Sequence, residues 1–199
     1  MAAEQYTPPP VTEEAATPLA KLSASDFRMY NRMAEAMDYF VSSNLSDSRS
    51  KNLIRSQHNH FRSTWKQMYE AASSGKRPRN VSLRQFILTG LQFCRSIEMH
   101  HGIEEQHVFP MLAKKMPEFR KELHLLTQHK AIHKGIDKME AYLQNCNSGE
   151  TDFRMDELKA IMDSYGDVLW AHLDEEVQTL GAENMRKYWT IEEMRNMPM

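Results

Sequence analysis

The chain contains little of what marks secreted, membrane or nucleic-acid-binding proteins. Its two cysteines, Cys94 and Cys146, are widely separated, so neither a disulfide framework nor a cysteine zinc site is expected. No apolar run is long enough to span a bilayer, and the N-terminus lacks a basic, apolar signal segment. The formal net charge of −2 gives no basic surface for nucleic acid or anionic lipid. We therefore expect a cytoplasmic protein that binds neither nucleic acid nor membrane.

Glycine and proline are also scarce, with seven and eight residues, and they gather at breaks between long polar and apolar patterns. Runs of β-branched residues are absent, so strands are not expected. Residues 1–22 carry a triple proline and a scatter of Ala, Thr and Glu, which predicts a disordered tail. Residues 23–181 are predicted to form one helical domain, followed by a C-terminal extension over residues 182–199.

Apolar residues recur at helical spacing in four long segments after His58. Ser82 and Gln85 form a capping box at the start of the second of these segments. Pro110 is expected to kink or end that helix, and Gly181 to close the fourth. Short loops between long amphipathic helices predict an all-α, up-down-up-down four-helix bundle. An extra N-terminal helical segment and a short C-terminal helix, capped by Thr190, complete the expected fold.

Three pairs of metal-ligand residues occur at a spacing of four. This spacing places both side chains of a pair on one face of a helix. In each helix, that face is also the apolar one, and a further histidine lies on the apolar face upstream. The candidate ligands are His58, His100, Glu104, His129, His133, His172 and Glu176. Five imidazoles and two carboxylates directed into one space are the ligand set of a dinuclear metal site.

A single histidine on a helix, or a single His-xxx-Glu pair, is more often an ordinary residue than a ligand. Here the coincidence of all the pairs with apolar faces favours metal binding. Two buried carboxylates would be costly without a compensating cation. Imidazole and carboxylate donors without thiolate fit iron or manganese, with zinc as a further candidate.

Several neighbouring residues are second choices for the site. His101 and Glu105 also form an i,i+4 pair, but lie about 100° around the helix from the apolar stripe. His60 points away from that stripe, and His107 is either a pocket residue or a surface residue. The remaining polar residues close to the motifs are expected in solvent, namely His124, Asp174 and Glu175.

This arrangement resembles the hemerythrin-like (HHE cation-binding) proteins of fungi and bacteria. The resemblance covers the chain from about Asp26 to Gly181 and rests on the order His, HxxxE, HxxxH, HxxxE. It implies two iron ions, with manganese or zinc as lesser alternatives. By resemblance, one iron would be held by His129, His133 and His172, and the other by His58 and His100. Glu104 and Glu176 would bridge the two, and an open position would bind dioxygen or peroxide.

The resemblance allows two classes of function. The first is a non-haem diiron protein that binds and activates dioxygen or peroxide, as an oxidase or oxygenase if it turns over. The alternative is a reversible dioxygen carrier or sensor, or an iron-handling protein without turnover. Five imidazoles against two carboxylates resemble carriers more than carboxylate-rich oxygenases. No motif identifies catalytic residues, an organic substrate or a protein partner.

Residues 41–57 interrupt the first amphipathic pattern. This segment is rich in Ser, Asn, Arg and Lys, unlike its flanks, and its removal would join Phe40 directly to His58 in one continuous apolar stripe. Its ends, Val-Ser and Gln, can be encoded by the ends of a short spliceosomal intron. We interpret it as a retained in-frame intron or a gene-model error, with a genuine loop insertion as the alternative. Sequencing of the mature transcript distinguishes the two.

Overall fold

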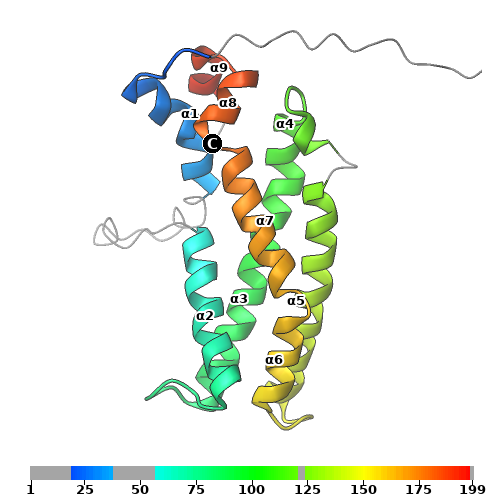
Figure 1. Ribbon diagram of the computed structural model, residues 1–199. Helices are drawn as coiled ribbons and strands as arrows, with labels where there is room; N and C mark the ends of the chain where they lie inside the picture. The colour runs from blue at the N-terminus through cyan, green and yellow to red at the C-terminus, as the bar shows by residue number, and fades with distance from the viewer. Residues whose placement is uncertain (1–18, 38–56, 121–123, 198–199) are drawn as a thin grey trace, which may run out of the picture.

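The computed structural model describes residues 19–37, 57–120 and 124–197, and within these ranges the chain forms helices and no strand (Figure 1). The expected all-α fold is confirmed. The bundle consists of α2 (Gln57–Ser74), α3 (Leu83–Ile103), α5 (His124–Ser148) and a fourth helix in two parts, α6 (Met155–Asp163) and α7 (Gly166–Thr179). Outside the bundle lie α1 (Ala24–Met37) and the short α8 (Ala182–Tyr188) and α9 (Ile191–Asn196), so the C-terminal extension contains two helices rather than one.

Local sequence signals set the ends of the bundle helices. The Ser82 hydroxyl accepts a hydrogen bond from the backbone N–H of Gln85, whose side chain accepts one from the Ser82 N–H, as the capping box predicts. Gly75 follows α2 and Gly149 follows α5, both with positive φ, a conformation that side chains with a Cβ rarely adopt. Thr190 and Glu193 form a second capping box at α9.

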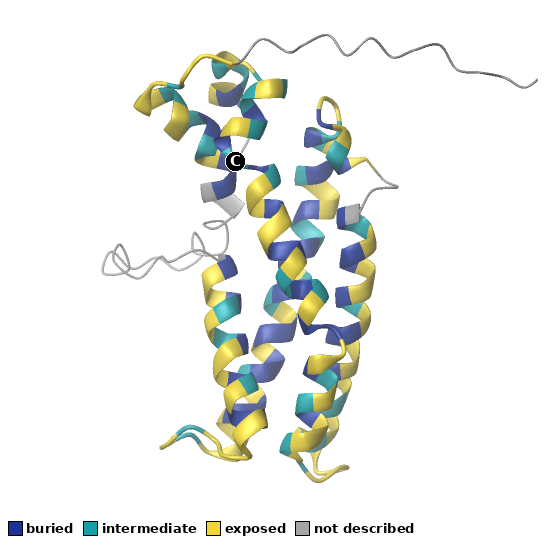
Figure 2. Cartoon of the chain, viewed as in Figure 1, coloured by how far each residue is buried: buried dark blue, intermediate teal, exposed yellow. Residues whose placement is uncertain are grey.

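The apolar core occupies the inner faces of the bundle helices (Figure 2). Its fully buried members include Met68 of α2, Ile97 of α3, Ile136 of α5 and Leu169 of α7. Each such side chain contributes about 1.5–3 kcal/mol through burial. Because neighbouring bundle helices are antiparallel, the starts of α2 and α5 and the end of α3 meet at one end of the bundle. All the candidate ligands on these three helices lie at that end.

The fourth helix is divided at Ser164 and Tyr165, where one continuous helix was predicted. The Tyr165 ring packs directly over Gly135 of α5, where a Cβ would lie 2.2 Å from the Tyr165 Cγ. Gly166 leaves room for Trp65 of α2, whose ring would be 3.0 Å from a Cβ at that position. Two aromatic rings are therefore accommodated by interrupting the helix rather than by separating the helices. The spacing of apolar residues within α6 and α7 does not by itself indicate this interruption.

A second apolar cluster joins α1 to the C-terminal helices at the ligand end of the bundle. Tyr30 and Met33 of α1 pack with Met185 of α8 and Met194 of α9. The Arg186 guanidinium donates to the Ala20 carbonyl at 2.6 Å. The C-terminal extension is therefore integrated into the fold as a cap, together with α1.

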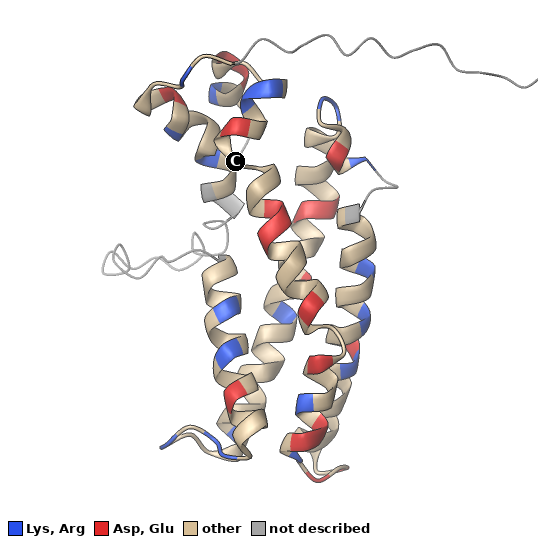
Figure 3. Cartoon of the chain, in the orientation of Figure 1, with Lys and Arg blue, Asp and Glu red and all other residues tan. Residues whose placement is uncertain are grey.

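Charged residues of both signs are interspersed along the outer faces of the helices (Figure 3). Among the described residues, no helix combines the length and the apolar character that crossing a membrane requires.

The predicted insertion, residues 41–57, lies outside the described residues except for Gln57, the first residue of α2. We expect its deletion to raise both the melting temperature and the iron content. The deleted form would continue the apolar stripe of the preceding helix into α2, and ordering the segment costs about 1–2 kcal/mol per residue in backbone entropy. Thermal melts and iron assays of both forms test this. A deleted form that melts lower and binds less iron would make the segment an integral part of the fold.

Candidate metal centre

Helix α3 supplies adjacent histidines that face different neighbours. It lies between α2 and α5, and successive helix residues point about 100° apart. His100 contacts His58 of α2, with their Nε2 atoms 3.2 Å apart. His101 contacts α5 instead, where its ring stacks on His129 at a centroid distance of 3.9 Å and an interplanar angle of 12°. One turn of α3 thereby serves both sides of the centre.

Immediately after these histidines, α3 passes into a π-helical turn, η3 (Glu104–Val108), and then α4 (Phe109–Leu112). The backbone N–H of Phe109 bonds to the carbonyl of Glu104, five residues earlier. Pro110 has no N–H to donate and lies in the first turn of α4, where none is needed. The predicted kink at Pro110 therefore takes the form of a widened turn that begins at Glu104. Such turns are frequent at functional sites.

The first group of candidate ligands joins α2, α3 and α7 around Glu104. His100 Nε2 lies 2.8 Å from Glu104 Oε1, and His58 Nε2 lies 3.4 Å from Glu176 Oε2. These four side chains are buried, and each offers one donor atom within 4.8 Å of the others. Together they can hold one cation.

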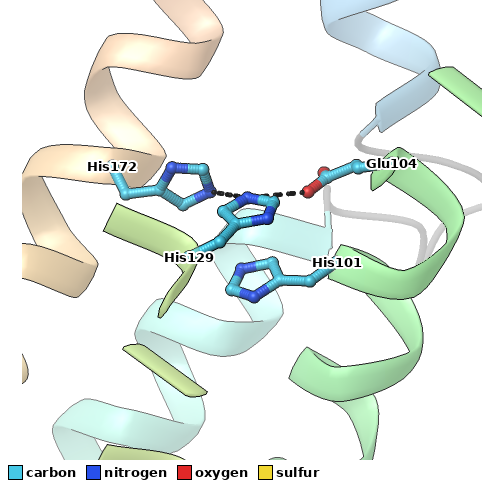
Figure 4. Close-up of side chains that lie close together, drawn as sticks. All are labelled: His101, Glu104, His129 and His172. Atoms are coloured by element: carbon cyan, nitrogen blue, oxygen red, sulfur yellow. Dashed lines mark hydrogen bonds and ion pairs between the residues drawn. The ribbon is translucent and has the colours of Figure 1, made fainter. Parts of the chain in front are cut away.

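The second group joins α3, α5 and α7, and also contains Glu104 (Figure 4). His129 Nε2 lies 3.2 Å from His172 Nε2 and 3.4 Å from Glu104 Oε2. In Figure 4, His129 lies between His172 and the Glu104 carboxylate, with the His101 ring beneath it. Two ligands of one ion, each about 2.1 Å from it, lie about 3.0–3.4 Å apart at tetrahedral or octahedral angles. The 3.2 Å spacing of the paired Nε2 atoms in both groups has this value.

Glu104 connects the two groups because its oxygens face in different directions. Oε1 is directed to His100 and Oε2 to His129. Glu176 has a similar position, since its Oε2 lies 3.4 Å from His58 Nε2 and 3.8 Å from His172 Nε2. A carboxylate between two imidazole pairs is suited to bridge two ions.

Three side chains of the centre have buried polar atoms without a hydrogen bond. Among the described residues, none makes a hydrogen bond to the carboxylate oxygens of Glu104 and Glu176 or to either nitrogen of His101, although all three side chains are buried. Burial, together with the neighbouring Glu176 carboxylate, raises the pKa of Glu104 well above its usual range. Buried carboxylates without donors are costly unless a cation balances them. The residues present therefore fit a bound metal.

Two imidazoles of the centre are held in the neutral form that binds metal. Burial lowers the pKa of His172 to about 3 and that of His101 well below its usual range, so both are neutral near pH 7. His129 Nδ1 lies 2.7 Å from Glu105 Oε1, and His172 Nδ1 lies 3.3 Å from Gln128 Oε1. Donation of Nδ1–H to these oxygens leaves each Nε2 lone pair directed at the centre.

The structure gathers six of the seven predicted ligands into the two groups: His58, His100, Glu104, His129, His172 and Glu176. His133 is half-buried and lies beside them, with its ring 5.1 Å from that of His101 and 6.3 Å from that of His129. Its role as a ligand stays a prediction. Among the second choices, His60 and His107 are exposed, and Asp174 forms an ion pair with Arg62 at 2.6 Å. The His124 side chain lies outside the described residues.

His101 is the residue that sequence reasoning placed second and the structure brings into the centre. Its 100° offset from the apolar stripe counted against it. A helix packed between two neighbours, however, has two buried faces about that far apart. The HxxxE pattern that starts at His100 indicated the face toward α2. The adjacent histidine, His101, was the sequence feature that could have indicated the face toward α5. Glu105, the predicted partner of His101, is exposed and lies outside both groups, where its Oε1 is 2.7 Å from His129 Nδ1.

An antiparallel helical bundle with buried histidines and carboxylates from all its helices defines a class of metal-binding proteins. The Hemerythrin HHE cation binding domain matches residues 50–183, and the chain belongs to this family. A curated relative, the "Dimeric xanthone biosynthesis cluster protein R11" of Cryptosporiopsis sp. (strain 8999), is 29% identical over 101 residues, 48% of this chain. The match spans 38% of the length of that relative. No solved structure matches the chain.

Proposed function

We propose that this protein is a cytoplasmic non-haem diiron protein that binds and activates dioxygen or peroxide. The observation that carries the proposal is the pair of buried four-residue groups that share Glu104. One iron would be held by His101, Glu104, His129 and His172, and the other by His58, His100, Glu104 and Glu176. Glu104 would bridge them, and Glu176 is placed to do the same.

The donor set supports iron or manganese over zinc. It contains imidazole and carboxylate without thiolate, which suits iron and manganese. Structural zinc sites are typically single and closed, whereas these two groups share a ligand. Iron, when bound, supplies the electrons that reduction of dioxygen or peroxide requires. The buried imidazoles hold it, and Glu105 and Gln128 orient two of them through their Nδ1 atoms.

Reversible dioxygen carriage, sensing or iron handling is the second candidate. The observation that favours it is the composition of the groups, with five imidazoles and two carboxylates. The relative from Cryptosporiopsis, by contrast, is named for a biosynthesis cluster, which supports a role in biosynthesis over carriage. The two candidates differ in what happens after dioxygen binds.

Anaerobic loading with ferrous iron, followed by optical spectra on exposure to air, tests the proposal. We expect about two irons per chain, because seven ligand residues suit two ions that share a bridge. A spectrum that appears in air and is lost again on removal of oxygen indicates a carrier. Lasting oxidation indicates redox chemistry or iron handling. A protein that takes up a single zinc and no iron would contradict the site as drawn.

Substitution of His101 and of His133 tests the ligand assignment. We expect His101→Ala to lower the metal content about as strongly as His129→Ala or His172→Ala, because the three lie in one group. His133→Ala should lower it less, since His133 lies outside both groups. The exposed His60, replaced by Ala, is the matched control. Metal analysis of the purified variants measures this. A larger loss of metal in His133→Ala than in His101→Ala would instead support His129 and His133 as the ligand pair of α5.

A further inference from the structure

A groove of about 760 Å³ opens on the outside of the bundle, between α2 and the break that separates α6 from α7. Its lining includes the aromatic residues Trp65, Tyr69 and Trp170. This volume is in the range of small-molecule sites. Trp65 and Tyr69 follow the candidate ligand His58 on α2, about 10 and 16 Å further along its axis. The groove is therefore separate from the metal centre but on the same helix.

Aromatic rings connect this groove to the metal centre without interruption. The His100 ring lies 5.3 Å from that of Phe61, which lies 6.3 Å from Phe93. The Phe93 ring lies 5.8 Å from Trp65, and Trp65 is stacked on Tyr69 at 6.5 Å with an interplanar angle of 10°. Electron tunnelling decays less steeply through packed rings than across gaps. Of these residues, tryptophan and tyrosine can themselves be oxidised by one electron, so Trp65 and Tyr69 are the redox-active members.

Tyr69 also has a place to send its proton. A tyrosine becomes a neutral radical only if its phenolic proton leaves with the electron. The Tyr69 hydroxyl donates to Asp163 Oδ1 at 2.7 Å at the edge of the groove. The Lys159 ammonium donates to the same phenol oxygen at 3.2 Å and to Asp163 Oδ2 at 2.6 Å, which fixes both partners in place.

The other aromatic residues next to Trp65 differ from Tyr69 in their polar partners. Trp170 and Tyr69 each have a cation over the ring, Arg62 at 4.8 Å and Lys159 at 5.0 Å, so Tyr69 is set apart by the hydrogen bond that its hydroxyl donates to Asp163. Tyr165 is buried, and its hydroxyl is directed to the sulfur of Met139 at 3.0 Å, which is a poor proton acceptor. Tyr69 is thus distinguished by its carboxylate partner and by its position in the groove.

We propose that Trp65 and Tyr69 carry electrons from a phenol bound in the groove to the metal centre, so that the protein oxidises phenols at its surface with hydrogen peroxide. Each electron passes from Tyr69 to Trp65 and on to the centre, and the Tyr69 proton passes to Asp163. The tyrosyl radical then takes a hydrogen atom from the phenol, which becomes a phenoxyl radical. Two such transfers, with two protons, reduce one peroxide to two waters.

The groove fits a phenol in its chemistry. Aromatic faces stack on planar rings, so the ring of a bound phenol can stack on the aromatic side chains of the groove. Tyr69 also lines the groove, and its hydroxyl can therefore contact the hydroxyl of that phenol. Tyr69 is then the catalytic residue that contacts the substrate, and Trp65 is the relay. This inference rests on the proposed diiron function and adds a substrate class and a second site to it.

The test uses the iron-loaded full chain with hydrogen peroxide. A spin trap, followed by peptide mass spectrometry without added phenol, should place the radical adduct on Tyr69. With guaiacol as the probe phenol, Tyr69→Phe should slow its oxidation by roughly an order of magnitude and abolish that adduct. The iron content should match the wild type, because Tyr69 is outside both ligand groups. Asp163→Asn should also slow guaiacol oxidation, since the proton then lacks its acceptor.

Tyr142→Phe is the matched control. Tyr142 is about 20 Å along α5 from His129, is also partly exposed, and packs against Phe153 instead of the aromatic path. It should behave as the wild type. Unchanged guaiacol oxidation in Tyr69→Phe, or an adduct confined to other residues, overturns the relay while leaving the diiron function standing. A wild type that binds no iron or consumes no peroxide overturns both.

Discussion

Replacement of Glu104 by glutamine is expected to reduce the iron content from about two ions per chain to less than one. Glu104 is the residue that occurs in both ligand groups, and its two oxygens face imidazoles of different groups. The amide is nearly the same size but offers one neutral oxygen, so neither ion keeps a charged bridging ligand. Metal analysis after anaerobic loading measures this loss.

The same substitution should have the opposite effect without metal. In the metal-free protein, the amide should raise the free energy of unfolding by about 1–3 kcal/mol, because the amide removes a buried charge that no cation balances. The adjacent Glu105→Gln is the control, since Glu105 is outside both groups and its amide oxygen can still accept from His129 Nδ1. Two full ions in Glu104→Gln would show that Glu104 is not a shared ligand.

Removal of the metal from the wild-type protein should lower the melting temperature by about 10–20 °C. A ligand present at one hundred times its dissociation constant stabilises the folded state by about 2.7 kcal/mol per site, and each kcal/mol corresponds to about 2–4 °C in a domain of this size. The loss leaves the carboxylates of Glu104 and Glu176 buried without a counter-charge. Thermal melts before and after chelation, and after return of iron, give the measurement.

The control for this experiment is the His129→Ala variant, loaded with iron in the same way. It should show a smaller change on chelation, because its second group is incomplete and only the first group can still hold an ion. A melting temperature of the wild type that does not respond to chelation or to iron would mean that the carboxylates are balanced without a metal.

The sequence was sufficient to predict the all-α bundle and six of the residues that the structure brings together in the two groups. The capping boxes at Ser82 and Thr190 and the glycines at Gly75 and Gly149 act within one turn of chain, so they can be recognised without tertiary information. The i,i+4 spacing likewise fixes which side chains share a helix face. The six predicted ligands now gathered in the two groups followed from this local geometry.

Only the tertiary structure decided which residues meet across helices. His101 enters the centre because α3 is packed between α2 and α5, and periodicity along α3 cannot report a second neighbour. The fourth helix is interrupted at Tyr165, whose ring packs over Gly135 of α5, a residue 30 positions away. The sequence by itself determined the helices, their apolar faces and the chemistry of the donors, since these depend on neighbours within a turn. The pairing of donors and the path from Tyr69 to His100 depend on contacts between distant segments, which only the packed bundle specifies.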